Sequence, residues 1–384
     1  MATIRVISSL IQAVTLLALT RVLGAQEFGQ FAAVSASGAM VAVLGGLGLS
    51  SLALRISAFE NPRGVAASIA LLRWPIVFSS ATCTGLVAYV LLGHTALLAI
   101  TAAVLYAASE SIGEAVESLL YGSSRAARAQ VAMVARRLIM LLGVTCGFLM
   151  NETLVGVVVA ASTICVIAGV FLKGTLASPV PFRLIARASV PLWSATVLAK
   201  LQTLDVVVAS MALSPAQAGI YSAAARVSSP LNTFAVAALS VLTPRLADRH
   251  AVDAREGLFR QSRRSMCILA MLLGALSPVV GFTAEFVLGP DYIGAAWVAT
   301  VLTISTAVAA ITQVYVSHFF AAGDGFTVAK IRAILMPSAL AVGFIAGAVV
   351  GPLGLAVSML GAQLLLWLML ASAHRRTQGG TRER

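Results

Sequence analysis

The feature that most constrains this chain is a succession of about twelve apolar runs, each close to the roughly 20 residues that an α-helix needs to cross a bilayer. Turn-forming residues such as Asn61 and Pro62, or Gly351 and Pro352, separate the runs. The sequence therefore predicts an all-α, polytopic membrane protein. The expected spans cover approximately residues 2–20, 29–54, 67–92, 95–120, 129–150, 153–172, 186–211, 219–246, 262–283, 294–320, 329–350 and 352–373.

The composition supports a membrane protein over a soluble one. Hydrophobic residues make up 59% of the chain and charged residues only 10%, whereas about a quarter of the residues of a soluble domain are charged. The mean hydropathy is +0.97. A net charge of +12 would suggest nucleic acid as a partner of a soluble protein. Here membrane topology accounts for most of it, so we expect the lipid bilayer, and no nucleic acid, as a partner.

The distribution of basic residues predicts the orientation of the helices. Cytoplasmic loops are enriched in Lys and Arg, and most of the 26 basic residues fall in alternate connections on one side of the predicted spans. Both termini should then be cytoplasmic, and the opposite connections are too short to form a large extracellular domain. The residues assigned to cytoplasmic connections include Arg5, Arg55, Arg63, Arg73, Arg125, Arg128, Arg136, Arg137, Lys173, Arg183, Arg187, Lys330 and Arg332, with six arginines from Arg245 to Arg264 and four from Arg375 to Arg384.

A repeated segment indicates two related halves. The residues Leu23, Gly29, Ala33, Leu49, Ser50, Leu52 and Arg55 have identical counterparts at the same spacing in Leu213, Gly219, Ala223, Leu239, Ser240, Leu242 and Arg245. We therefore predict one six-helix lobe over residues 1–178 and a second over residues 179–384. An even number of helices in each half makes the repeats parallel, an arrangement that transporters use around a central cavity.

Ionisable residues at membrane depth are the first candidates for function, because they are costly there. Asp205 and Arg226 lie at equal distances from the turn at Pro215, so we expect them to meet, either as a structural ion pair or in a cavity. Lys200 lies near the middle of its predicted helix. It should face the interior, where it either lines the cavity or contacts another helix.

Glu110, Glu114 and Glu117 share one stripe of a helix by their spacing. They predict either a site for a coupling cation or interfacial salt bridges to Arg125 and Arg128. Arg21 is a further candidate, which either snorkels to the outer interface or contacts substrate. Arg55 and Arg245 either follow the positive-inside rule or form paired contacts at an inner gate.

Catalytic and metal sites find little support in the sequence. The four cysteines lie in apolar runs without a C-x-x-C spacing, and the four histidines lie in separate segments. The chain has no nucleotide-binding Gly-rich loop with Lys, no H-E-x-x-H and no G-x-S-x-G motif. We predict that the protein is not an enzyme and has no metal or cofactor.

The order of several short motifs resembles the polysaccharide flippases of the Wzx type. The opening residues Arg21, Leu23, Gly24, Phe28, Gly29 and Phe31 are similar to that family's R-x-L-G-x-x-x-F-G-x-F segment. In the second half, Asp205, Gly219, Tyr221, Ala224, Arg226, Pro244, Arg245 and Leu246 resemble its D…G-x-Y…A-x-R…P-x-L pattern. Leu288, Gly289 and Tyr292 look like its L-G-x-x-Y element. The likeness extends over nearly the whole chain.

This resemblance implies the two-lobe fold of the multidrug, oligosaccharidyl-lipid and polysaccharide exporters. It also implies alternating access in a bacterial plasma membrane, with a lipid-linked oligosaccharide as substrate and a polysaccharide polymerase and glycosyltransferases as partners. Lys200, Arg226, Asp205 and Arg21 would then contact the diphosphate head in the cavity. Two alternatives are an antiporter for drugs or cations from the same superfamily, which needs acidic cavity residues, and a membrane-embedded glycan transferase, which needs a catalytic loop.

Overall fold

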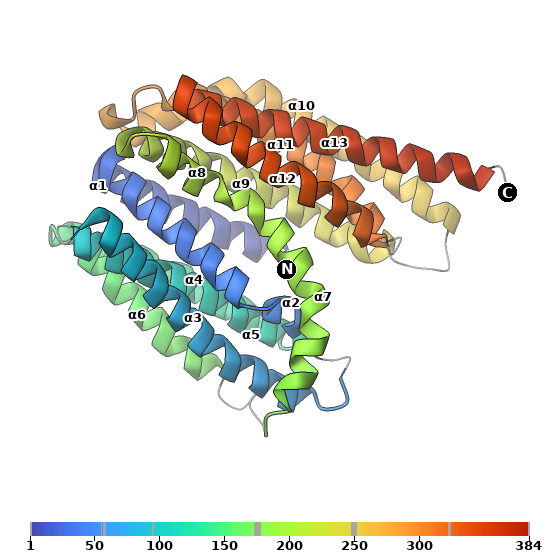
Figure 1. Ribbon diagram of the computed structural model, residues 1–384, viewed down its shortest axis with the longest axis horizontal. Coiled ribbons are helices and arrows are strands. Elements are labelled where there is room, and N and C mark those ends of the chain that lie inside the picture. The colour runs from blue at the N-terminus through green and yellow to red at the C-terminus, as the bar shows by residue number, and fades with distance from the viewer. Residues whose placement is uncertain are drawn as a thin grey trace. The chain divides into compact units, whose positions relative to one another are not determined.

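The computed structural model describes residues 2–54, 56, 59–93, 96–172, 178–246, 252–321 and 324–382 of the 384-residue chain (Figure 1). All regular elements in these ranges are helices, which confirms the predicted all-α class. The longer helices are α1 (Ala2–Gly45), α3 (Pro62–Leu92), α4 (Leu97–Gly122), α5 (Ala126–Leu149), α6 (Thr153–Leu172), α7 (Phe182–Lys200), α9 (Pro215–Leu246), α10 (Val252–Leu288), α11 (Ala295–Ala321), α12 (Gly325–Val350) and α13 (Pro352–Arg382). The short elements are α2 (Leu49–Ala53), the 3-10 turns η3 (Leu201–Leu204) and η4 (Pro290–Tyr292), and α8 (Asp205–Ala212).

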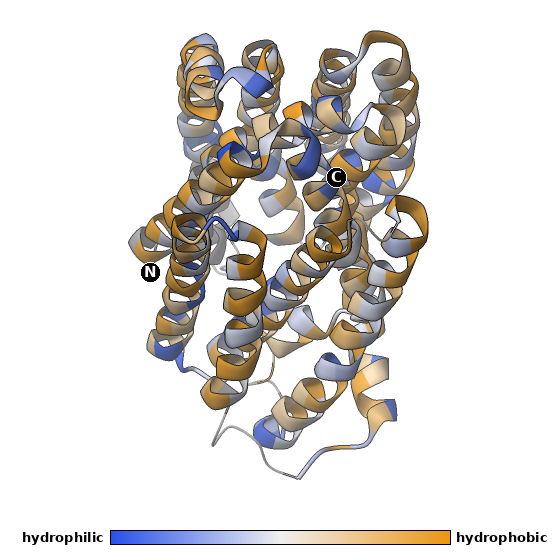
Figure 2. Cartoon of the chain, turned by 90° about the vertical axis from the view of Figure 1, so that its left-hand side faces the viewer, coloured by the Kyte–Doolittle hydropathy of each residue, from blue (hydrophilic) through white to orange (hydrophobic). Residues whose placement is uncertain are grey.

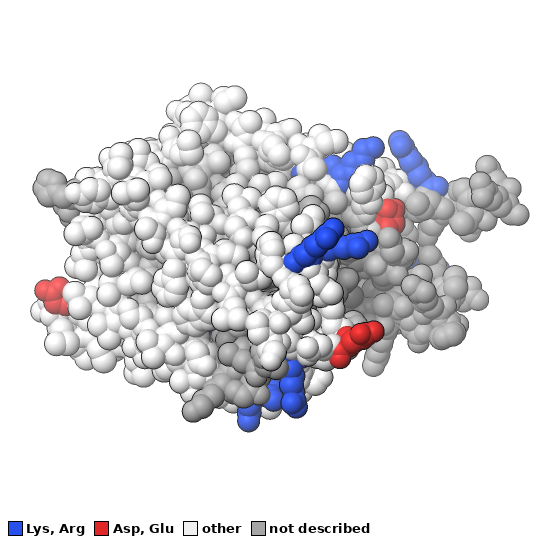
Figure 3. All heavy atoms as spheres, turned by 60° about the horizontal axis from the view of Figure 1, so that its bottom comes forward, with Lys and Arg blue, Asp and Glu red and all other residues white. Residues whose placement is uncertain are grey.

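The helices have the length and surface that a bilayer requires. Within the described residues, nine helices are long and apolar enough to cross a membrane. Large apolar side chains are exposed on them, for example Leu91 at 76% and Phe286 at 86%. Figure 2 shows hydrophobic residues along most of the helix length, and the face in Figure 3 carries few charged side chains. A surface of this kind is stable against lipid and not against water, which confirms a multi-pass membrane protein.

Two of the predicted spans differ from continuous helices. The runs 2–20 and 29–54 are joined in α1, which changes direction at Gly24, where φ is 69° and ψ is 172°, and the second run ends in the short helix α2. The run 186–211 is divided by η3 into α7 and α8. A left-handed φ is accessible to glycine without a steric penalty. Gly24 therefore provides the break between the first two spans.

The chain divides into two compact units. The first comprises Leu10–Val207, and the second comprises Val208–Arg384 together with Ala2–Ser9. Hydrogen bonds attach α7 to the first unit: Trp193 Nε1 donates to the carbonyl oxygen of Leu44 at 2.9 Å, and the hydroxyls of Ser51 and Thr196 lie 2.9 Å apart. The boundary between residues 178 and 179, which is inferred from the sequence repeat, stays a prediction.

One central helix organises each unit. In the first unit α4 packs against α2, α3, α5 and α6, and in the second α11 packs against α9, α10, α12 and α13. More than half of the most apolar window is buried in α4 and in α11, 56% in each, compared with 22 to 39% in the other spans. The two central helices correspond to the fourth predicted run of each half. The equivalent positions of α4 and α11 in the two halves agree with a parallel repeat.

Glycines allow two helices of the first unit to approach closely. A Cβ atom added to Gly156 of α6 would lie 2.1 Å from the carbonyl oxygen of Gly143 and 2.9 Å from the Cα atom of Gly147, both in α5. Small residues four apart permit such backbone contact between membrane helices, where dispersion and not the hydrophobic effect drives packing. This contact holds α5, which carries Arg136 and Arg137, against α6.

Candidate functional site

A network of charged side chains joins α4 to α5 inside the first unit. On α4 the spacing of four and three aligns Glu110, Glu114 and Glu117 on one stripe. Arg136 Nη2 lies 2.8 Å from Glu117 Oε1, and Arg136 Nη1 lies 3.7 Å from Glu110 Oε2. The same Nη1 donates a hydrogen bond to the Glu110 carbonyl oxygen at 2.9 Å. Arg137 forms a short ion pair with Glu110 Oε1. Two arginines therefore neutralise two of the glutamates.

A third buried arginine lies close to this network. Arg73 of α3 is 5% exposed, and it donates through Nη2 to Ser111 Oγ at 2.7 Å and through Nη1 to the Ala42 carbonyl oxygen at 3.4 Å. It also interacts electrostatically with Glu114. Hydrogen bonds of this kind reduce the cost of holding a guanidinium away from water. Arg73 thus links α1, α3 and α4.

Lys200 forms the outermost ion pair of the network. Its Nζ atom lies 3.6 Å from Glu114 Oε1, and the two side chains are 42% and 48% exposed, whereas the Arg136 side chain is 6% exposed. Lys200 ends α7 immediately before the 3-10 turn η3. Charged side chains that are half exposed in a spanning segment require water rather than lipid around them. This pair is therefore the part of the network that a soluble or headgroup anion can reach.

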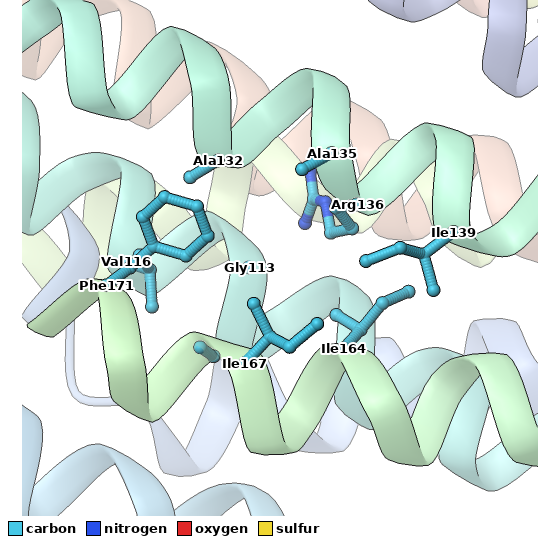
Figure 4. A pocket seen from close by; sticks show the side chains of 10 residues that line it. Gly113, Val116, Ala132, Ala135, Arg136, Ile139, Ile164, Ile167 and Phe171 are labelled. Carbon is cyan, nitrogen blue, oxygen red and sulfur yellow. The ribbon is translucent and has the colours of Figure 1, made fainter.

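A pocket next to the network is apolar. It occupies about 320 Å³ including its open mouth, and Arg136 is the one charged residue among its lining side chains. Figure 4 shows Ile139, Ile164, Ile167 and Phe171 pointing into the space between α5 and α6. An apolar pocket does not hold a charged head group without a large desolvation cost. The pocket is suited to hydrocarbon and not to the polar part of a substrate.

The remaining candidate residues lie in different parts of the fold. Asp205 begins α8, where its Oδ1 atom accepts a hydrogen bond from the backbone N–H of Val206 at 2.8 Å. Arg226 is half-buried in α9, and Arg21 is exposed on α1 just before the change of direction at Gly24. The predicted meeting of Asp205 with Arg226 stays a prediction.

Two candidates for the inner gate fall outside this description. Arg55 is not among the described residues, and of Arg245 the structure describes the backbone in α9 but not the side chain.

The structure corrects two expectations about charged residues. Arg73, Arg136 and Arg137 do not lie in cytoplasmic connections, because each is within a helix and the first two are 5% exposed. The described ion pairs join the glutamates to Arg136, Arg137 and Lys200, and not to Arg125 and Arg128. Pairing with carboxylates and hydroxyls is what permits these arginines to lie at membrane depth.

The sequence contains a signal that would have found the main pair. Residues at equal distances from a tight turn face one another on antiparallel helices, and Glu110 and Arg137 are equidistant from the turn between Ser123 and Ser124. The same reasoning suggested the pair of Asp205 and Arg226. Applied to the turn between α4 and α5, it predicts the pair of Glu110 and Arg137 from the sequence alone.

The network carries a positive excess. Three carboxylates face four cations when Arg73 and Lys200 are included with Arg136 and Arg137. Each carboxylate has a cationic partner, and the cation at the exposed edge is a lysine whose pair is long and partly hydrated. An arrangement of this kind favours an anionic ligand over a cationic one.

Comparisons with known proteins give the family and the fold. The family model described as "Polysaccharide biosynthesis protein" matches residues 1–250, well over half of the chain. No curated protein matches the chain significantly.

Solved structures of the same fold cover nearly the whole chain. An inward-facing multidrug resistance MATE family transporter of the MOP superfamily has a TM-score of 0.70 and 14% identity, over 98% of this chain and 99% of that one. The lipid II flippase MurJ in an inward closed conformation has a TM-score of 0.69 and 14% identity, over 96% and 86%. A MOP superfamily transporter from Pyrococcus furiosus, whose title describes a binding pocket of reverse polarity, has a TM-score of 0.63 and 18% identity, over 97% and 95%. At these identities the similarity establishes the two-lobe fold.

Proposed function

Because the chain belongs to the polysaccharide biosynthesis protein family, we propose that it is a flippase for a lipid-linked oligosaccharide carried on a polyprenyl diphosphate. It acts by alternating access in a bacterial plasma membrane, with both termini in the cytoplasm, for the synthesis of a cell-surface polysaccharide. Glycosyltransferases supply its substrate and a polysaccharide polymerase uses the product.

The observation that carries this proposal is the positive excess of the charged network at membrane depth. A diphosphate is an anion that cannot enter hydrocarbon unaided. Lys200 is the cation best suited to bind it, because its pair with Glu114 is 3.6 Å long and both side chains are nearly half exposed. A phosphate oxygen competes with the Glu114 carboxylate for the ammonium group. Arg226, Asp205 and Arg21 remain the further candidates for substrate contact.

An antiporter for drugs or cations is the second candidate function. Three glutamates at membrane depth favour it, because such transporters need a carboxylate for a cation or a proton. Against it, each of the three glutamates pairs with a basic side chain in this structure. A cation would have to displace an arginine or a lysine first. A flippase for an anionic substrate therefore fits the positive charge excess of the network better than a cation antiporter does.

Deletion of the gene tests the class of substrate. A flippase predicts accumulation of lipid-linked oligosaccharide in the inner leaflet and loss of the surface glycan, with unchanged sensitivity to cationic drugs. Increased drug sensitivity with normal surface glycan would instead support the antiporter.

Complementation of the deletion strain with variants tests the role of Lys200. Lys200→Gln should abolish most export at a normal protein level, whereas Lys200→Arg should restore it. The exposed Arg183 of α7 provides a control, because Arg183→Gln removes one positive charge from the same helix away from Glu114. Full export by Lys200→Gln would contradict the role given to Lys200.

A further inference from the structure

We propose that the basic end of the second unit contains a binding site for anionic phospholipid headgroups, formed jointly by α10 and α13. Five exposed arginines make up this site, here called the arginine surface: Arg260, Arg263 and Arg264 of α10 with Arg375 and Arg376 of α13. The proposal concerns lipid of the surrounding bilayer and does not depend on the transported substrate.

Aromatic packing brings the two parts of the arginine surface together. The rings of Phe259 in α10 and His374 in α13 are buried, with centroids 4.5 Å apart. The ring of His318 in α11 lies 4.6 Å from Phe259 and 4.7 Å from His374. Arg260 directly follows Phe259 in the chain, and Arg375 directly follows His374. A buried three-helix contact therefore brings together the segments of α10 and α13 that carry these arginines.

Helix length places the arginine surface at the depth of lipid headgroups. Arg260 and Arg264 are about 28 and 24 residues from the far end of α10, or about 42 and 36 Å at 1.5 Å per residue, and Arg375 is about 23 residues, or about 35 Å, from the start of α13. The hydrocarbon core of a bilayer is about 30 Å thick, and the bilayer with its headgroups is about 40–45 Å thick. Arginines that follow Phe259 and His374 thus meet phosphate groups rather than acyl chains.

The charge of the two segments favours a bound anion. Over the first turns of α10 the sequence holds Arg255 and the three arginines of the surface against Asp253 and Glu256, so the segment keeps a positive excess. Like charges at i, i+3 and i, i+4 repel one another, as in Arg260 with the two arginines that follow it. A phosphate between α10 and α13 offsets this repulsion and accepts hydrogen bonds from planar guanidinium groups.

The positive-inside rule does not by itself explain why arginines of two helices converge at this end of the second unit. The rule requires basic residues on the cytoplasmic side but not their convergence from two helices. Arg183 and Arg187 at the start of α7 satisfy it as well, since both are exposed at the basic end of a helix in the first unit. They belong to one helix only. This pair provides a matched control with the same number of charges.

The experiment measures lipid binding to the full chain. Phosphatidylglycerol and phosphatidylcholine are titrated into the purified, detergent-solubilised protein, and bound lipid is counted by native mass spectrometry. Clusters of basic residues contribute to anionic lipid binding in proportion to their number. We expect Arg375→Gln with Arg376→Gln to weaken phosphatidylglycerol binding about tenfold, equivalent to about 1.4 kcal/mol. Arg260→Gln with Arg263→Gln should have the same effect. Arg375→Lys with Arg376→Lys should keep most of the affinity for phosphatidylglycerol.

The control pair decides the outcome. Arg183→Gln with Arg187→Gln should change phosphatidylglycerol binding less than twofold, and phosphatidylcholine binding should not respond to any variant. An equal loss in the control pair would mean that only total charge matters and would overturn the proposal. So would equal binding of the two lipids to the unaltered protein. Because the α10 and α13 variants test the same site from separate helices, misfolding of one leaves the other decisive.

Discussion

Removal of one cation from the charged network should have opposite consequences at Arg136 and at Lys200. In both positions a change to glutamine removes one positive charge and keeps a polar side chain. Arg136 is 6% exposed and Lys200 is 42% exposed. We expect Arg136→Gln to reduce the stability of the protein, and Lys200→Gln to reduce export while leaving the fold intact.

The expected magnitudes follow from the distances and the surroundings of the two pairs. At an effective dielectric constant of about 20, the gross attraction between Arg136 and Glu117 at 2.8 Å is about 6 kcal/mol. For the half-exposed pair of Lys200 and Glu114 at 3.6 Å, a value near that of water gives about 1 kcal/mol. Desolvation reduces the net value of the buried pair, but removing one of its partners still costs about 3–5 kcal/mol. The exposed pair contributes about 0–1 kcal/mol.

Denaturant unfolding of the full chain in one detergent measures the two changes side by side. Arg136→Gln should lower the free energy of unfolding by about 3 kcal/mol or more, and Lys200→Gln by less than about 1 kcal/mol. A second change, Glu117→Gln in the Arg136→Gln protein, removes the carboxylate that has lost its partner and should recover about 1–2 kcal/mol. The reasoning is refuted when Arg136→Gln is as stable as the unaltered protein, or when Lys200→Gln is the less stable of the two.

The remaining predictions concern helix packing in the first unit. Gly156→Ala should destabilise the protein by about 1–3 kcal/mol, because its Cβ atom would lie 2.1 Å from the carbonyl oxygen of Gly143 and would separate α5 from α6. Gly169→Ala in the same helix is the control: apart from its own helix backbone and chain neighbours, no atom of the described residues lies within 4 Å of its added Cβ, so it should be neutral or stabilise α6 by up to about 1 kcal/mol. Gly48→Ala should cost about 1–3 kcal/mol, because Gly48 has φ +71° and an added Cβ would lie 2.6 Å from the backbone nitrogen of Trp193. Thermal unfolding of the purified variants checks all three, and a Gly169→Ala protein less stable than Gly156→Ala would contradict the packing argument.

The spans of the fold could be predicted from the sequence because hydropathy and length carry the signal directly. Each apolar run corresponds to helix, since backbone groups in lipid have no partner except one another. What hydropathy could not locate is the 3-10 turn between Lys200 and Asp205. That turn lies inside an apolar run without Gly or Pro at the break. A hydropathy averaged over a window does not report a local change of helix type inside an apolar run.

The charged residues of the site could be predicted in part. The glutamate stripe follows from helical spacing, and Lys200 follows from its place in an apolar run. The positive-inside rule assigns Arg136 and Arg137 to a cytoplasmic connection, because it treats an arginine near a span end as a topological signal. The rule does not consider whether a carboxylate lies on the neighbouring helix. Pair geometry across the turn, and not charge counting, distinguishes a buried arginine from a cytoplasmic one.

Burial divides the charges of the first unit into two functional kinds. Arg73 and Arg136 are almost inaccessible, so a ligand could reach them only if helices separated, and their partners are already fixed by short hydrogen bonds. Lys200 and Glu114 meet at the edge of the same network with half of their surface free. An anion bound to Lys200, as proposed, would take the place of the Glu114 carboxylate as its partner. The exposed pair is therefore the part of the network where the proposed anionic ligand can compete for a charged partner.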